Sequence, residues 1–131
     1  MTEIQGYHFI ITHTEQVRQF LIAFDQTVDH DNIDQRKLYA KLISEEFHEF
    51  LTAYIEGNDL KELDGCCDLI WVILGYTLSR GWDFDGAMNE VAASNMSKLD
   101  PTTGKPLKRA DGKVLKGANF FSPNLTPFLS R

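Results

Sequence analysis

Apolar residues recur at helical spacing through most of the first hundred positions of the chain, and polar residues interrupt this pattern at a few points. Thr12 and Glu15 have the spacing of a capping box, and the apolar pattern after them predicts a first helix over 13–28. The next pattern predicts a second helix over 35–56, with Asp34 as its N-terminal cap. The first part of the chain is therefore predicted to form two amphipathic helices.

Two more helices and a turn-rich tail follow. A third helix is predicted over 59–79 and is apolar nearly all round, which favours burial by the domain and by a second subunit. A fourth begins after Asp83 or Asp85, and Asp111-Gly112 predicts a hairpin turn. We therefore predict an all-α, single-domain protein over 1–131, with a helical body over about 12–98 and a tail over 99–131.

Composition and charge narrow the function classes. The 131 residues are 43% hydrophobic and carry a net charge of −6, which argues against a protein that coats nucleic acid or an anionic membrane. The charge is uneven, because 17 acidic and 6 basic residues lie in 1–97, whereas 2 acidic and 6 basic residues lie in 98–117. No apolar window suits a membrane span, no signal peptide is evident, and the adjacent Cys66 and Cys67 favour a reduced, cytoplasmic protein.

Two glutamates lie inside the apolar face of the second helix. With Leu38 set to zero on a helical wheel, Glu49 falls at about 20° and Glu46 at about 80°, while Glu45 lies at the edge of the stripe. An ionised carboxylate that leaves water costs several kcal/mol unless a partner compensates it. The pattern therefore predicts a counter-charge at Glu46 and Glu49.

The third helix adds Asp64 and Asp68, which are one turn apart. If these two helices pack antiparallel, both aspartates can face Glu46 and Glu49, and no lysine or arginine interrupts 45–49. A divalent cation resolves the repulsion, and hard oxygen ligands favour Mg²⁺, with Mn²⁺ as a substitute, over zinc. The alternative is that some of these acids are solvated surface or capping groups.

Four segments of the chain resemble a known family. The acidic segments 45–49 and 64–72 are similar to the ExxE…ExxD pattern of the MazG-like, all-α nucleoside triphosphate pyrophosphohydrolases, which are related to dimeric dUTPases and phosphoribosyl-ATP pyrophosphohydrolase. The segment 90–98, with SNMSK, and the segment 111–117, DGKVLKG, look like two further motifs of that family. The resemblance covers about residues 35–123 and implies a four-helix bundle completed by dimerisation.

One position departs from the family pattern. The residue three places before Asp68 is usually Glu in the family but is Gly65 in this chain. Asp64 or Glu62 could complete the second acidic motif, and we favour Asp64 because one full turn places it on the side of Asp68.

The resemblance implies cleavage of a nucleoside triphosphate between its α and β phosphates, which yields a monophosphate and pyrophosphate. Metal ions would be held by Glu46, Glu49 and Asp68, with Asp64 as the fourth acid, and Glu45 or Glu46 would orient or deprotonate a water. It also implies phosphate or metal contacts for Asn95 and Lys98, and we add Lys113 and Lys116 as phosphate-binding candidates. A (deoxy)nucleotide substrate, a role in cleaning the nucleotide pool, and a homodimer or dimer of dimers follow from the same resemblance.

Two other classes compete with this interpretation. Glu45 and His48 have the Glu-x-x-His spacing of di-iron helical bundles, although the chain holds no second copy of that motif. A non-enzymatic helical dimerisation module could instead use the acids to bind a structural cation, but such a module gives the segment 95–98 no role.

Overall fold

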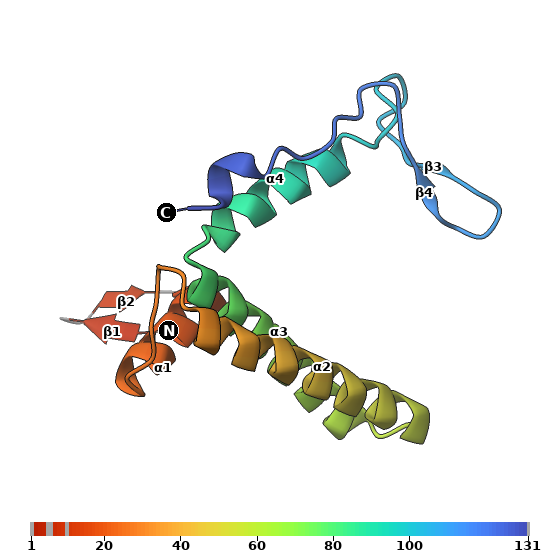
Figure 1. The fold of residues 1–131 in the computed structure, drawn as a ribbon. Coiled ribbons are helices and arrows are strands. Elements are labelled where there is room, and N and C mark those ends of the chain that lie inside the picture. The colour runs from red at the N-terminus through yellow and green to blue at the C-terminus, as the bar shows by residue number, and fades with distance from the viewer. Residues whose placement is uncertain (1, 5–6, 10, 131) are drawn as a thin grey trace. The chain divides into compact units, whose positions relative to one another are not determined.

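The computed structural model describes residues 2–4, 7–9 and 11–130, which form two compact units (Figure 1). The first unit contains the described residues up to Trp82 together with Ser130, and the second spans Asp83–Leu129. Four α-helices dominate the described residues, so the all-α prediction is confirmed. That the whole chain acts as a single domain stays a prediction.

Helix α1 (His13–Ala23) opens the helical part of the first unit. Its predicted cap is confirmed, because Thr12 Oγ1 accepts a hydrogen bond from the Glu15 backbone N–H at 3.1 Å. The predicted end at residue 28 is wrong. Asp25 takes a left-handed φ of 58°, and the Thr27 N–H then donates to Gln35 Oε1 at 2.9 Å, so this segment turns toward the next helix instead of continuing α1.

Helix α2 (Ile33–Glu56) begins two residues earlier than predicted. Its cap is Asn32, whose Oδ1 accepts from the Gln35 N–H at 3.0 Å while its Nδ2 donates to Thr27 Oγ1 at 2.9 Å. The prediction of Asp34 as the cap is therefore wrong. An amide side chain can accept and donate together, whereas an ionised carboxylate only accepts.

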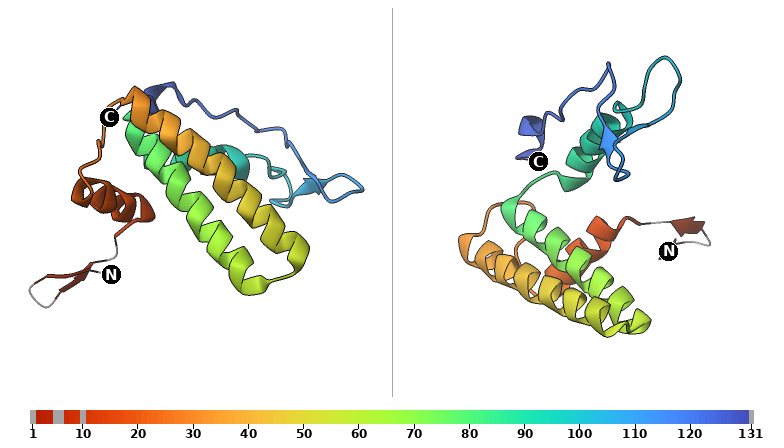
Figure 2. Two further views of the ribbon diagram at one scale, coloured as in Figure 1. Left: turned by 60° about the horizontal axis from the view of Figure 1, so that its bottom comes forward. Right: turned by 90° about the vertical axis from the view of Figure 1, so that its right-hand side faces the viewer.

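Helix α3 (Asp59–Arg80) returns antiparallel to α2, and the two helices lie side by side in both views of Figure 2. The turn between them is as predicted, since Gly57 ends α2 with a φ of 68° and Asn58 Oδ1 caps α3 by accepting from the Lys61 N–H at 3.1 Å. Near the other end of the pair, Gly75 packs against the ring of the buried Tyr39, where any Cβ would collide. This glycine lets the two helices approach closely.

The burial of α3 is uneven. Val72, Leu74 and Leu78 are buried, whereas Leu60 and Leu63 are 78% and 63% exposed. The first unit alone therefore buries only the second half of α3, and burial of the first half by a second subunit stays a prediction. Among the described residues, none of the helices combines the length and apolar character needed to cross a membrane.

The second unit contains helix α4 (Phe84–Met96), which Asp83 caps by accepting from the Gly86 N–H at 3.1 Å. Strands β3 (Leu107–Lys108) and β4 (Val114–Leu115) then pair antiparallel, so the predicted hairpin is confirmed. The tail contacts α4 again where Ser94 Oγ donates to the Phe121 carbonyl at 2.8 Å. It ends in the 3₁₀ helix η1 (Thr126–Phe128).

A short pair of N-terminal strands was not predicted from the pattern. Strand β1 (Thr2–Ile4) pairs antiparallel with β2 (Tyr7–Phe9), ahead of α1.

Candidate active site

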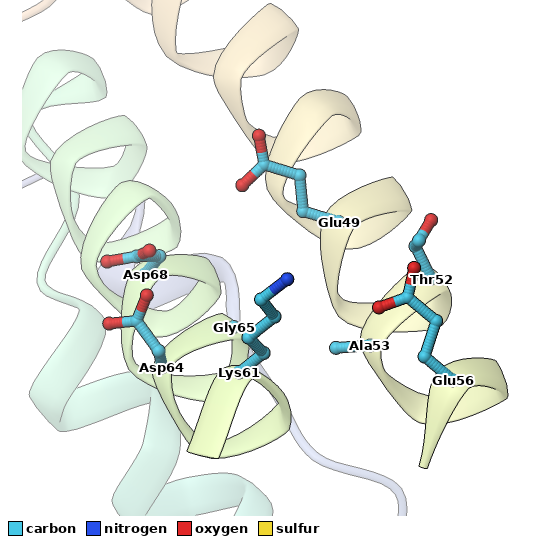
Figure 3. A pocket seen from close by; sticks show the side chains of 8 residues that line it. All are labelled: Glu49, Thr52, Ala53, Glu56, Lys61, Asp64, Gly65 and Asp68. Atoms are coloured by element: carbon cyan, nitrogen blue, oxygen red, sulfur yellow. The ribbon is translucent and has the colours of Figure 1, made fainter. Parts of the chain in front are cut away.

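A cavity of about 350 Å³ lies between α2 and α3, and carboxylates from both helices line it (Figure 3). Glu49 faces it from α2, and Asp64 and Asp68 line it from α3. Its remaining walls are formed by side chains near the α2–α3 turn and by small residues between the helices, namely Thr52, Ala53, Glu56, Lys61 and Gly65. The structure thus brings three of the four predicted metal ligands to one cavity.

Glu46, the fourth, joins the same cluster one turn before Glu49. Its Oε2 atom is enclosed by protein and has no hydrogen-bond partner. Desolvation raises the pKa of Glu46, and the negative charges of Glu49, Asp68 and Asp64 raise it further. A hydrogen bond from the protonated carboxyl of Glu46 to Glu49 raises the pKa of Glu46 as well. Glu46 therefore presents an enclosed oxygen atom, Oε2, that is available as a metal ligand.

Asp68 is perturbed in the same way. Desolvation raises its pKa most, followed by the charges of Asp64 and Glu49. The four acids therefore form one electrostatic cluster, as the sequence pattern predicts. In the described part of the chain, no three carboxylate, imidazole or thiol groups already converge at metal-ligand distance. The chemistry of the donor set fits a hard divalent cation, and side-chain rotation must complete its coordination.

Gly65 explains the departure from the ExxD pattern. It is buried, and a Cβ added to it would stand 3.1 Å from the Phe50 Cα, which is tighter than ordinary packing. A glutamate at this position would require the α2 backbone at Phe50 to move away by a few tenths of an ångström. Asp64 lines the cavity with Asp68, whereas Glu62 lies in a separate hollow beside Leu63. The geometry therefore favours Asp64 over Glu62 as the additional acid.

The structure does not bring the predicted catalytic residue Glu45 into the cluster. Glu45 is exposed and lies 4.0 Å from Lys41 Nζ, as an ion pair on the outer surface of α2. His48, the other half of the Glu-x-x-His spacing, is also exposed. Of the two candidates for activating water, only Glu46 belongs to the acid cluster, and its Oε2 atom is enclosed by protein.

The predicted substrate-binding residues all belong to the second unit. Asn95 is exposed near the end of α4, and the carbonyl of Lys98 accepts from the Gly117 N–H at 2.9 Å. Lys113 lies in the β3–β4 turn, and Lys116 Nζ stands 4.7 Å from the ring centroid of Phe120. This unit therefore brings the ends of the segments 94–98 and 111–117 together, while contact of these residues with a substrate stays a prediction.

Sequence reasoning missed three polar residues that line the cavity, Thr52, Glu56 and Lys61. For Thr52 and Lys61, the sequence spacing already indicated a position beside the acids. Thr52 follows Glu49 by three residues, and Lys61 precedes Asp64 by three, which places each pair on one helix face.

The fold and the acid cluster together define a class of protein. Two antiparallel helices with a Glu-x-x-Glu pair facing an aspartate pair have the architecture of a MazG-like, all-α nucleotide pyrophosphohydrolase. The family model described as phosphoribosyl-ATP pyrophosphohydrolase matches residues 17–95, and the chain belongs to this family. The match includes all four clustered acids. No curated protein matches the chain. The family consists of pyrophosphohydrolases that act on a nucleotide, so we assign the protein to the hydrolases.

The raised pKa values of Glu46 and Asp68 predict how Mg²⁺ changes stability with pH. The folded protein holds these protons more tightly than the unfolded chain, where the ordinary values are 4.5 and 3.8. Their stabilising contribution is therefore complete at low pH and is lost as pH rises through the raised pKa values. Because a cation binds the ionised form, MgCl₂ should raise the Tm more at about pH 7.5 than at about pH 5. Thermal denaturation with EDTA or MgCl₂ measures this, and an equal gain at both pH values would contradict it.

Proposed function

We propose that the protein hydrolyses a (deoxy)nucleoside triphosphate between its α and β phosphates, with Mg²⁺ as cofactor, and releases a nucleoside monophosphate and pyrophosphate. The observation that carries this proposal is the cluster of Glu46, Glu49, Asp64 and Asp68 across α2 and α3, in which an enclosed Glu46 oxygen has no partner. Such a cluster is costly unless it binds cations, and family membership supplies the nucleotide.

Glu46, Glu49 and Asp68 would hold the metal, with Asp64 beside Asp68. When bound, Mg²⁺ neutralises phosphate oxygens and makes a coordinated water more acidic. A water oxygen forms a bond to the α phosphorus, the bond from that phosphorus to the α–β bridging oxygen breaks, and its electron pair leaves on pyrophosphate. Glu46 orients the water and accepts its proton, because its Oε2 atom is enclosed within the cluster and has no hydrogen-bond partner there.

The second unit supplies cations for the phosphates in this proposal. Lys98, Lys113 and Lys116 compensate the charge that develops on pyrophosphate, and Asn95 supplies a polar contact near the substrate. The sequence supplies both kinds of charge that a metal-bound polyanion requires, because a basic segment follows the acidic helical body along the chain.

A homodimer or a dimer of dimers belongs to the same proposal. Large apolar side chains of the first unit stay exposed in the single chain, including Tyr54 at 63%, Ile55 at 81% and Leu60 at 78%. Large apolar side chains that stay this exposed favour a protein interface over contact with water. A second copy of the chain would bury them and complete the bundle.

A substrate panel tests the function. Pure protein is incubated with each canonical NTP and dNTP, with dUTP and dCTP as the first candidates, and with phosphoribosyl-ATP, the substrate named in the family description. We expect equal amounts of monophosphate product and pyrophosphate with MgCl₂, and none with EDTA. Release of orthophosphate, or no turnover of any nucleotide, would refute the proposal. A preference for a nucleotide that cells must remove would support a role in cleaning the nucleotide pool.

A further inference from the structure

The lysine Lys61 lines the acidic cavity. It belongs neither to the acids that would bind metal nor to the basic tail, so its role in the cavity is not yet assigned. Lys61 lies in the first turn of α3, where its backbone N–H donates to Asn58 Oδ1 at 3.1 Å. This bond fixes the start of the helix and therefore the position from which the side chain leaves. Figure 3 shows the Lys61 ammonium extending from α3 toward the side of α2 that carries Glu49 and Glu56, which also line the cavity.

The ammonium of Lys61 is not held by a single carboxylate. In the described ranges, the side chain of Lys61 has no ion pair within 4.0 Å, although the same cavity is lined by Glu49, Glu56, Asp64 and Asp68. Lys41, in contrast, pairs with Glu45 on the outer surface of α2. A lysine that serves only to neutralise a neighbour would resemble Lys41. Lys61 instead keeps its three donors open toward the cavity.

We propose that Lys61 binds the pyrophosphate portion of the nucleotide inside the acidic cavity, at the end nearest the α2–α3 turn. This rests on the proposed function, because it assigns a residue to the polyphosphate of that substrate. Glu46 and Asp68 both lie about ten residues from the α2–α3 turn, one on each helix. Lys61 lies about two turns before Asp68, and therefore nearer to that turn. A flexible, strongly charged ammonium at that end can contact oxygens of the leaving group that the carboxylates would repel.

The same charge should act in opposite directions on the two ligands of the cavity. An ammonium that lines the same cavity as the carboxylates opposes a divalent cation that binds there, and it attracts a phosphate anion. Removal of its charge should therefore tighten metal binding and weaken pyrophosphate binding. A structural role alone would not move the two affinities in opposite directions.

The test uses three variants of the full-length protein. Lys61→Met removes the charge, Lys61→Arg keeps it, and Lys37→Met is the matched control, because Lys37 is exposed on α2 well away from the cavity. Electron paramagnetic resonance measures binding of Mn²⁺ alone, and calorimetry measures binding of pyrophosphate in the presence of MgCl₂. Circular dichroism and thermal denaturation confirm that each variant is folded, which we expect since Lys61 is exposed.

For Lys61→Met we expect Mn²⁺ to bind about two- to fivefold more tightly and pyrophosphate about tenfold more weakly, as a single nearby charge would cause. Lys61→Arg should keep both affinities within about twofold of the wild type, as should Lys37→Met. If Lys61→Met leaves pyrophosphate binding unchanged, or shifts both affinities in the same direction, the proposal is wrong. Wild-type protein that binds neither probe would also overturn it.

These titrations need no turnover, so they separate this inference from the proposed function. If the protein hydrolyses no nucleotide but Lys61→Met shifts the Mn²⁺ and pyrophosphate affinities in opposite directions, Lys61 remains a pyrophosphate-binding residue and the proposed reaction is rejected. Turnover with unchanged pyrophosphate affinity in Lys61→Met would keep the reaction and reject the role of Lys61.

Discussion

Glu49→Gln is expected to lower kcat/KM for the nucleotide by about a thousandfold or more. Glu49 lines the cavity from α2 and raises the pKa of both Glu46 and Asp68, so it lies at the centre of the acid cluster. An amide has the same shape but carries no charge to hold a cation. A bound divalent ion contributes several kcal/mol to the transition state, and each 1.36 kcal/mol is about a tenfold change in rate.

Steady-state kinetics at saturating MgCl₂ measure this loss. The matched control is Asp34→Asn, which also removes one negative charge from α2 but lies in its first turn. The control should stay within about threefold of the wild type, since it removes only an exposed charge near a helix N-terminus. Glu49→Gln with more than about a tenth of wild-type activity would mean that Glu49 does not hold a catalytic ion.

Glu46→Gln should stabilise the metal-free protein and abolish its activity. The glutamate is desolvated, repelled by three neighbouring acids and unpartnered at Oε2, so its ionised form opposes folding. A neutral amide removes that repulsion. We expect the Tm in EDTA to rise by about 2–4 °C, which is the shift that a modest gain in stability produces in a chain of this size. The stabilisation by MgCl₂ should largely disappear, because one of its ligands is lost.

Thermal denaturation with EDTA and with MgCl₂ measures both effects. Glu45→Gln is the comparison, since Glu45 is adjacent in sequence but exposed and paired with Lys41. It should not raise the Tm in EDTA. A Glu46→Gln protein that is less stable than wild type in EDTA would show that the Glu46 charge is compensated within the fold. Activity assays of both variants also decide which glutamate activates water.

The sequence predicted the parts of the site that depend on helical spacing. The positions of Glu46 and Glu49 inside an apolar stripe, and the Gly57-Asn58 turn, were enough to place α2 against α3 and to bring four acids together. These features are local, because helix geometry and a glycine cap fix them within one or two turns.

The features that sequence reasoning missed depend on contacts between distant segments. The end of α1 is set by the bond from Thr27 to Gln35, and the close approach at Gly65 is set by the backbone of α2 at Phe50. The cap at Asn32 likewise depends on Thr27 in the preceding loop. The place of Lys61 beside the acids also depends on the packing of two helices, since a lysine is unremarkable at a helix start until the cavity beside it is known. The spacing of apolar residues along the sequence carries no information about such contacts.

The central claim is that the acid cluster between α2 and α3 releases pyrophosphate from a nucleotide with the help of Mg²⁺. A ³¹P nuclear magnetic resonance time course of the wild-type protein with its best nucleotide and MgCl₂ tests it most directly. We predict that the triphosphate signals are replaced by one monophosphate signal and one pyrophosphate signal, and that the reaction stops on addition of EDTA. Signals of orthophosphate and a nucleoside diphosphate, or turnover that continues in EDTA, would contradict the claim.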